Sequence, residues 1–136
     1  MGETLENFMP MKEKVKIEYI FAKVSVNTLW KMVGTPIGLA KWFCDSCERD
    51  DNTFRFEWQR STQDAECLKE VDGNLIRFRW DDEDHPRAFF EFKLTRNDLT
   101  KDVTLEITDF ASMDDEDDCV DLWNTQVESL RRVLGA

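Results

Sequence analysis

The stretch Asp114–Gly135, DDEDDCVDLWNTQVESLRRVLG, decides how the rest of this 136-residue chain can fold. Its large apolar residues recur at alternating intervals of three and four, which places them in one stripe along an α-helix. They are Val120, Trp123, Val127, Leu130 and Leu134. Acidic residues mark the start of this helix, and Arg131, Arg132 and Gly135 mark its end, as the helix dipole and a glycine cap favour. Such a helix is roughly 28 Å long, so its apolar stripe needs a partner surface about as wide as a small domain.

The chain before this helix supplies the partner surface as strands in which apolar and polar residues alternate. The first strand is predicted from Val15 to Val24, and a weaker one from Gln63 to Val71 has Ala65, Cys67 and Val71 on one side. Clearer alternation covers residues 54–59, 76–80, 88–94 and 103–107, with turn-rich breaks at residues 50–52, 72–74, 81–86 and 97–101. We therefore predict six to seven strands joined by short turns, which form an antiparallel meander with one face in water.

Two short helices are predicted between the first strand and the others. Ser25 can cap a helix that ends at Gly34, and Thr35 with Pro36 can open a second helix over residues 37–43. Trp42, near the end of this second helix, is expected on the surface. The whole order predicts an α+β helix-grip fold, in which a curved antiparallel sheet of six to seven strands closes around the long C-terminal helix.

Several of these segments resemble proteins of the START-like (SRPBCC) superfamily, which includes the birch-pollen allergen. They are Leu29-Trp30, the run from Thr35 to Phe43, the strands 54–58 and 76–80, and Leu122-Trp123. The branch that the chain resembles more closely is related to the activator of the ninety-kilodalton heat-shock-protein ATPase. The resemblance covers about residues 14 to 135, so we expect an N-terminal leader over residues 1–13 and one domain over residues 14–136. It implies a cavity between sheet and helix that in many relatives holds an apolar small molecule, and it carries over no catalytic residue.

The alternation places a set of aromatic side chains on the concave face of the sheet, where they either line a ligand cavity or fill a core. Each ring buries about 150–250 Å², so we expect only a small pocket, opening near the short helices and the long helix. Asp109 is in phase with the apolar residues of its strand, and it either orients a ligand or reaches solvent at the strand end. The predicted cavity residues are Tyr19, Phe21, Phe56, Trp58, Phe78, Trp80, Phe90, Phe92, Asp109, Trp123 and Val127.

Cys44 and Cys47 have the CxxC spacing of a zinc half-site or a redox pair. The remaining candidate ligands, Cys67, Cys119 and His85, are not paired at ligand spacing. We therefore predict structural thiols and no metal site. A reversible disulfide between Cys44 and Cys47 stays open as an alternative, although thiols in a cytosol are kept reduced.

The sequence offers little for catalysis. His85, the single histidine, lies in the acidic segment 81–86, which we interpret as a solvated hairpin turn. There is thus no Ser–His or Cys–His constellation to propose, and no glycine-rich loop that could cradle a phosphate. We predict a non-catalytic domain without a cofactor.

Charge and composition exclude some partners. With 29 acidic and 18 basic residues the net charge is −11, and the basic residues are scattered, which argues against a nucleic-acid or anionic-membrane surface. No apolar run approaches the roughly 20 residues of a membrane span, and the N-terminus lacks the regions of a signal peptide. We expect a cytoplasmic protein that is a monomer or a weak homodimer.

Two functions therefore remain. The first is a module that binds a small apolar or aromatic ligand between sheet and helix. The second, implied by the closer resemblance, is a protein-interaction or chaperone-accessory domain. A pocket of a few hundred Å³ with a polar group at its end would favour the first, whereas a filled interior with an exposed apolar patch would favour the second.

Overall fold

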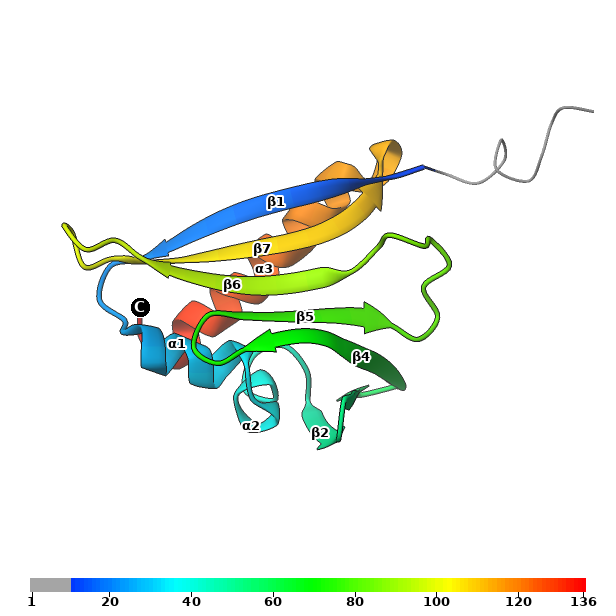
Figure 1. Ribbon diagram of the computed structural model, residues 1–136, viewed down its shortest axis with the longest axis horizontal. Coiled ribbons are helices and arrows are strands. Elements are labelled where there is room, and N and C mark those ends of the chain that lie inside the picture. The colour runs from blue at the N-terminus through cyan, green and yellow to red at the C-terminus, as the bar shows by residue number, and fades with distance from the viewer. Residues whose placement is uncertain (1–10) are drawn as a thin grey trace, which may run out of the picture.

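The computed structural model describes residues 11–136 and has the predicted helix-grip architecture, a curved sheet packed around one long helix (Figure 1). The strands are β1 (Lys12–Phe21), β2 (Ser46–Asp50), β3 (Thr53–Trp58), β4 (Ser61–Val71), β5 (Leu75–Trp80), β6 (Phe90–Arg96) and β7 (Val103–Ser112). The helices are α1 (Val26–Val33), α2 (Pro36–Leu39), the short η2 (Met113–Asp115) and α3 (Glu116–Leu134). β1 begins inside the range 1–13 predicted as a leader, and the rest of that range, residues 1–10, lies outside the described residues.

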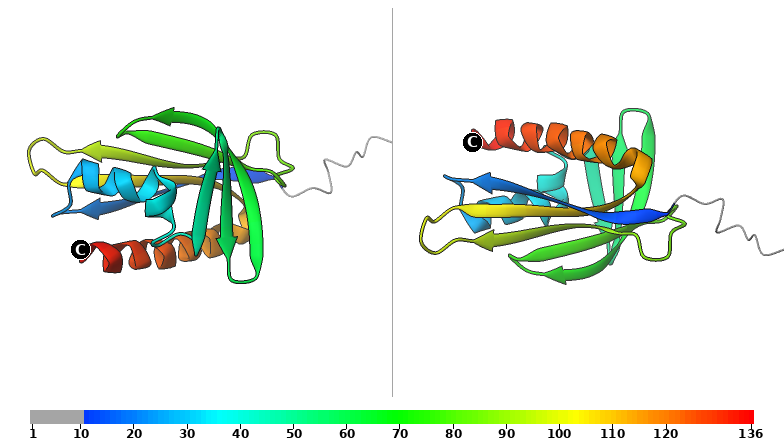
Figure 2. Two further views of the ribbon diagram at one scale, coloured as in Figure 1. Left: turned by 90° about the horizontal axis from the view of Figure 1, so that it is seen from below. Right: turned by 90° about the horizontal axis from the view of Figure 1, so that it is seen from above.

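The seven strands form one antiparallel sheet in the order β1-β7-β6-β5-β4-β3-β2. Figure 2 shows β2, β3 and β4 crossing the direction of β1, β6 and β7, so the sheet bends around α3. β4 contains a bulge between Cys67 and Lys69, which shifts the alternation by one residue. Ala65 and Cys67 are therefore buried as predicted, whereas Val71 is 45% exposed and the prediction for it was wrong.

The two short helices carry the predicted caps. Ser25 Oγ accepts from the N–H of Thr28, and Thr35 Oγ1 accepts from the N–H of Gly38 at 3.0 Å, with Pro36 opening α2. α2 is shorter than the predicted span 37–43. The chain turns after Leu39, whose carbonyl oxygen accepts from the N–H groups of three of the next residues, Trp42, Phe43 and Cys44.

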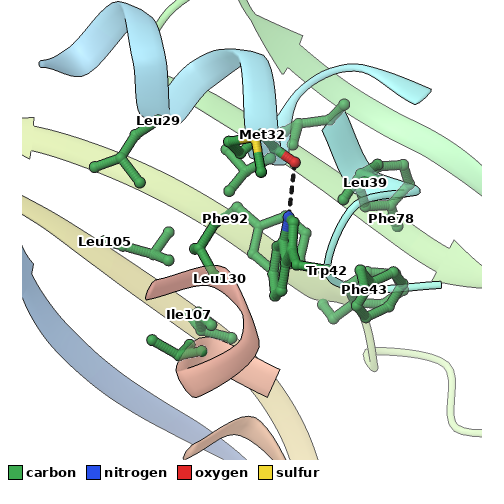
Figure 3. Close-up of a cluster of buried hydrophobic side chains, with 14 of the residues drawn as sticks. Leu29, Met32, Leu39, Trp42, Phe43, Phe78, Phe92, Leu105, Ile107 and Leu130 are labelled. Atoms are coloured by element: carbon green, nitrogen blue, oxygen red, sulfur yellow. Dashed lines mark hydrogen bonds between the residues drawn. The ribbon is translucent and has the colours of Figure 1, made fainter. Parts of the chain in front are cut away.

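This turn sends Trp42 into the core instead of onto the surface. Trp42 is 6% exposed, and its indole N–H donates to the carbonyl oxygen of Met32 at 2.8 Å, the dashed line in Figure 3. Its ring packs edge-on against Phe92 at 5.7 Å. The expectation of a surface Trp42 was therefore wrong, because the direction of the side chain depends on the turn after Leu39.

α3 ends as predicted. Gly135 has φ 69°, and the N–H groups of Gly135 and Ala136 bond to the carbonyl oxygens of Arg132 and Arg131. This is the Schellman pattern that glycine permits at low cost. Of the predicted stripe, Trp123, Val127 and Leu130 are buried and the two end residues are half-buried. Within residues 11–136 no helix is long and apolar enough to cross a bilayer.

Candidate ligand site on the concave face

The structure brings the predicted cavity residues together on the concave face, but most of them pack against one another. Seven of them are 5% exposed or less: Phe21, Phe56, Phe78, Phe90, Phe92, Trp123 and Val127. Neighbouring rings are in direct contact, with centroids 5.0 Å apart for Phe78 and Phe90 and 5.7 Å apart for Phe92 and Trp123. These side chains form the core between sheet and helix.

Phe43 occupies the centre of this core, and sequence analysis did not include it. Its ring stacks on Trp123 with centroids 5.9 Å apart and planes 8° apart, and it meets Phe56 edge to face at 5.2 Å. The apolar pair Trp42-Phe43 at the end of the predicted second helix was the available signal. Only the turn after Leu39 directs both rings inward, where they take up space that a ligand would otherwise use.

Two indoles at the edge of the core keep partial exposure, and we call Trp58 and Trp80 the indole rim. Trp80 stacks on the buried Phe90 with centroids 4.7 Å apart, and Trp58 lies 6.2 Å from Trp80. The Trp58 N–H donates to the carbonyl oxygen of Phe43 at 3.0 Å, which fixes its orientation. The rim is therefore a fixed aromatic surface that the rest of the core covers only in part.

Asp109 lies on the concave side, where its carboxylate binds the helix. Asp109 Oδ2 accepts from the indole N–H of Trp123 at 2.8 Å, and Oδ1 accepts from the backbone N–H of Phe110 at 2.8 Å. Cys119 Sγ lies 3.7 Å from the same carboxylate. Burial raises the pKa of Asp109, although these donors oppose the shift. The geometry gives Asp109 a role in orienting Trp123, which neither alternative from the sequence included.

We expect Asp109 to titrate above the ordinary aspartate pKa of about 3.9. Because burial makes the folded protein hold this proton more tightly than the unfolded chain, the contribution of Asp109 to stability is full below that value. It is lost as the pH rises through the raised folded-state pKa. The indole ¹⁵N–¹H resonance of Trp123 should report the titration by NMR. A midpoint below about 3.9 would mean that the hydrogen bonds outweigh burial.

Tyr19, another of the predicted cavity residues, connects β1 to α3 by a hydrogen bond. Its hydroxyl donates to Asn124 Oδ1 at 2.7 Å. Burial, assisted by the nearby Cys119, raises the pKa of Tyr19 to about 12, so the phenol stays protonated and keeps donating at neutral pH. Tyr19 thus has a structural partner in the described part of the chain.

Cys44 and Cys47 lie where the chain leaves α2 and enters β2. All four cysteines are free thiols. The Cys44 thiol donates to the carbonyl oxygen of Leu39 at 3.6 Å. The neighbouring Cys44 thiol lowers the pKa of Cys47, whereas the neighbouring Cys47, together with burial, raises the pKa of Cys44. Among residues 11–136 no three His, Cys, Asp or Glu side chains are grouped to hold a metal ion.

Purified protein is expected to contain no stoichiometric zinc, because two thiols without further ligands at hand make an incomplete site. Replacing Cys44 and Cys47 together by alanine should leave the fold intact, with the circular-dichroism spectrum unchanged. Elemental analysis of the wild-type protein checks the first expectation. About one zinc per chain, lost in the double variant, would contradict the interpretation as structural thiols.

His85 sits in the connection between β5 and β6. Its Nδ1 accepts from the backbone N–H of Arg87 at 3.2 Å, and the backbone N–H of His85 donates to Glu83 Oε2 at 2.9 Å. These bonds close a turn, which matches the interpretation of this segment as a hairpin connection.

Comparison with known proteins identifies related chains. The family model for the START-like superfamily domain matches residues 9–136. The solution structure of BfR322 from Bacteroides fragilis is 40% identical, with 93% of each chain covered and a TM-score of 0.67. No curated protein matches the chain.

Two more distant structures share the fold. The Aha1 dimer from Colwellia psychrerythraea is 17% identical, with 85% of this chain and 92% of that chain covered and a TM-score of 0.66. CalU16 from Micromonospora echinospora is also 17% identical, with 86% and 73% covered and a TM-score of 0.68. At these identities the similarity establishes the architecture of the sheet and helix.

Proposed function

Because the chain belongs to the START-like superfamily, we propose that it is a non-catalytic binding domain for a small apolar or aromatic molecule. The indole rim is the observation that carries this proposal. Trp58 and Trp80 keep an accessible side while their other contacts are with buried rings. A flat ligand stacked there gains about 25 cal/mol per Å² of buried apolar area, and stacking adds about 0.5–1.5 kcal/mol.

The packed interior limits the size of this ligand. Phe43 and Trp123 stack directly behind the rim, so a long chain cannot extend inward without displacing them. We therefore expect flat aromatic molecules to bind better than fatty acids or sterols. Of the predicted cavity set, Phe56 and Phe90 contact the rim directly and support it.

The test is a titration of fatty acids, sterols and polycyclic aromatics, followed by tryptophan fluorescence and by melting temperature. A ligand that binds only the folded state must raise the melting temperature in a concentration-dependent way. Micromolar affinity is reachable for a modest ligand after the cost of association. Trp80→Ala should abolish the response, whereas Leu122→Ala, at a residue of α3 that is 60% exposed, serves as the control and should keep it.

If no member of the panel changes fluorescence or melting, the protein-interaction domain becomes the better hypothesis. Trp42 is buried and therefore cannot serve as the surface position that tests this hypothesis. Ile37→Asp is suitable, since Ile37 is 77% exposed on α2, and it should abolish copurification with a partner. The ligand proposal also includes the location and the oligomeric state of the protein. We propose that the domain works in the cytoplasm, where its thiols stay reduced. We propose that it is a monomer or a weak homodimer. Sedimentation measures the oligomeric state.

A further inference from the structure

The convex face of the sheet carries a second aromatic feature. Phe89 and Phe110 meet edge to face there, with ring centroids 5.0 Å apart. The Arg77 guanidinium lies 4.2 Å from the Phe89 ring centre, and Lys14 Nζ lies 5.9 Å from it. Arg77 alternates along β5 with Phe78, which faces the core. The aromatic pair therefore sits on the opposite face of the sheet from the indole rim.

An ion pair holds this feature in place. Arg77 Nε donates to Glu91 Oε1 at 2.7 Å, and Glu91 is only 6% exposed although it lies on the outer face. A buried ion pair contributes little net stability, because desolvation offsets most of the attraction. What it does provide is a fixed position for Arg77 and for the Phe89 ring stacked on it. A rigid aromatic side chain of this kind is a typical centre of a binding surface.

A groove of about 720 Å³ opens beside the aromatic pair. It is lined by Phe89 and Phe110 together with Lys12 and Lys14 from β1 and Arg87 from the β5–β6 connection. In Figure 1 the start of β1 and this connection lie at the same end of the sheet. The ion pair of Lys12 with Glu83, at 2.9 Å, joins the two sides.

The groove is locally cationic in a strongly acidic chain. Lys14 and Arg87 are exposed, and neither forms an ion pair within the described residues. Lys12 is neutralised by Glu83, and Glu13 is a carboxylate in the lining. Lys14 and Arg87, which line the groove together with the aromatic pair, are complementary to carboxylates that flank an aromatic side chain.

We propose that this groove binds a short acidic peptide segment that carries an aromatic residue. Its carboxylates pair with Lys14 and Arg87, and its ring packs against Phe89. At physiological ionic strength charges are screened beyond about 8 Å, so a short peptide responds mainly to these nearby cations. A nucleic acid or an anionic membrane extends across the molecule and meets the net charge of −11, which repels it. The proposal does not depend on a ligand at the indole rim.

The experiment titrates the ¹⁵N-labelled full chain with a synthetic peptide in which phenylalanine is flanked by aspartate and glutamate. Amide shifts should be concentrated in residues 12–14, 87–89 and 110, and affinity should fall as salt is raised. The double variant Lys14→Glu and Arg87→Glu should weaken binding about tenfold or more, because two attractive charge pairs are lost and each reversed charge repels the peptide. Lys41→Glu changes an exposed cation outside the groove and should leave affinity unchanged.

Four results would overturn the proposal. The first is equal binding of the matching peptide with asparagine and glutamine, and the second is shifts centred on Trp58 and Trp80. The third is the absence of any shift at millimolar peptide. Concentration-dependent shifts of residues 12–14 and 87–89 without peptide, with a dimer in sedimentation, would assign the groove to a second copy of the chain instead. Phe89→Ala separates charge from stacking, since it should weaken binding while the salt dependence persists.

Discussion

Trp123→Ala is expected to lower the free energy of unfolding by about 3–5 kcal/mol, the range for large aromatic side chains removed from a core. Trp123 is 5% exposed and contacts Phe43, Phe90 and Phe92. Its loss leaves a cavity at the centre of α3 and also removes the indole donor to the buried carboxylate of Asp109. Denaturant titration monitored by circular dichroism measures the change.

Trp123→Phe is the matched control for this prediction. It keeps a ring in the core and removes the N–H that binds Asp109. Among the donors of residues 11–136, Asp109 Oδ2 then keeps only the weak Cys119 thiol. Because loss of a donor to a buried carboxylate costs about 1–3 kcal/mol, this variant should fall between the wild type and the alanine variant. A loss below about 1 kcal/mol for Trp123→Ala would show that the sheet does not hold the helix by this residue.

Gly38→Ala is expected to destabilise the domain by about 3 kcal/mol, at the upper end of the usual cost of overpacking. Gly38 is buried where α2 crosses the end of α1. A methyl group there would overlap the carbonyl oxygen of Lys31 and come within 2.6 Å of the Met32 Cα. These are backbone atoms, so the two helices must separate, which also disturbs the turn that directs Trp42 and Phe43 inward. Thermal and denaturant unfolding should both report the loss.

Gly73→Ala is the control for the same substitution at a glycine without neighbours. A methyl group at Gly73 meets nothing within 4 Å, but the φ of +76° strains any residue with a side chain. The expected cost is about 1–2 kcal/mol, from conformation alone. If Gly38→Ala cost no more than Gly73→Ala, the close approach of α1 and α2 would not be a constraint on the fold.

Most of the fold could be predicted because its signals are local. A strand repeats every two residues, which gives the alternation in β3, β5, β6 and β7. A helix repeats about every 3.6 residues, which gives the spacing of three and four in α3. The caps at Ser25, Thr35 and Gly135 depend on residues next to the helix ends. The errors arose where a local pattern was interrupted, at the bulge that exposes Val71 and at the early end of α2.

The candidate site was predictable only as a set of residues. Phase along the strands predicts which rings share the concave face, but phase carries no information about the volume between sheet and helix. That volume depends on Phe43, which enters from the α2–β2 connection. This packing also decides that the indoles of Trp58 and Trp80 are the rings that stay partly exposed. The sequence pattern therefore could not separate a lined cavity from a filled one.

The amino-acid sequence by itself determined the helix-grip order of elements, the apolar faces and the caps, since each of these is set by residues within one or two turns of each other. Only the tertiary structure decided that Phe43 fills the interior, that Asp109 binds Trp123, and that Phe89 and Phe110 meet on the outer face. The physical reason is that these contacts join residues far apart in the chain. Their geometry depends on the curvature of the sheet and the path of a turn, which no periodicity encodes.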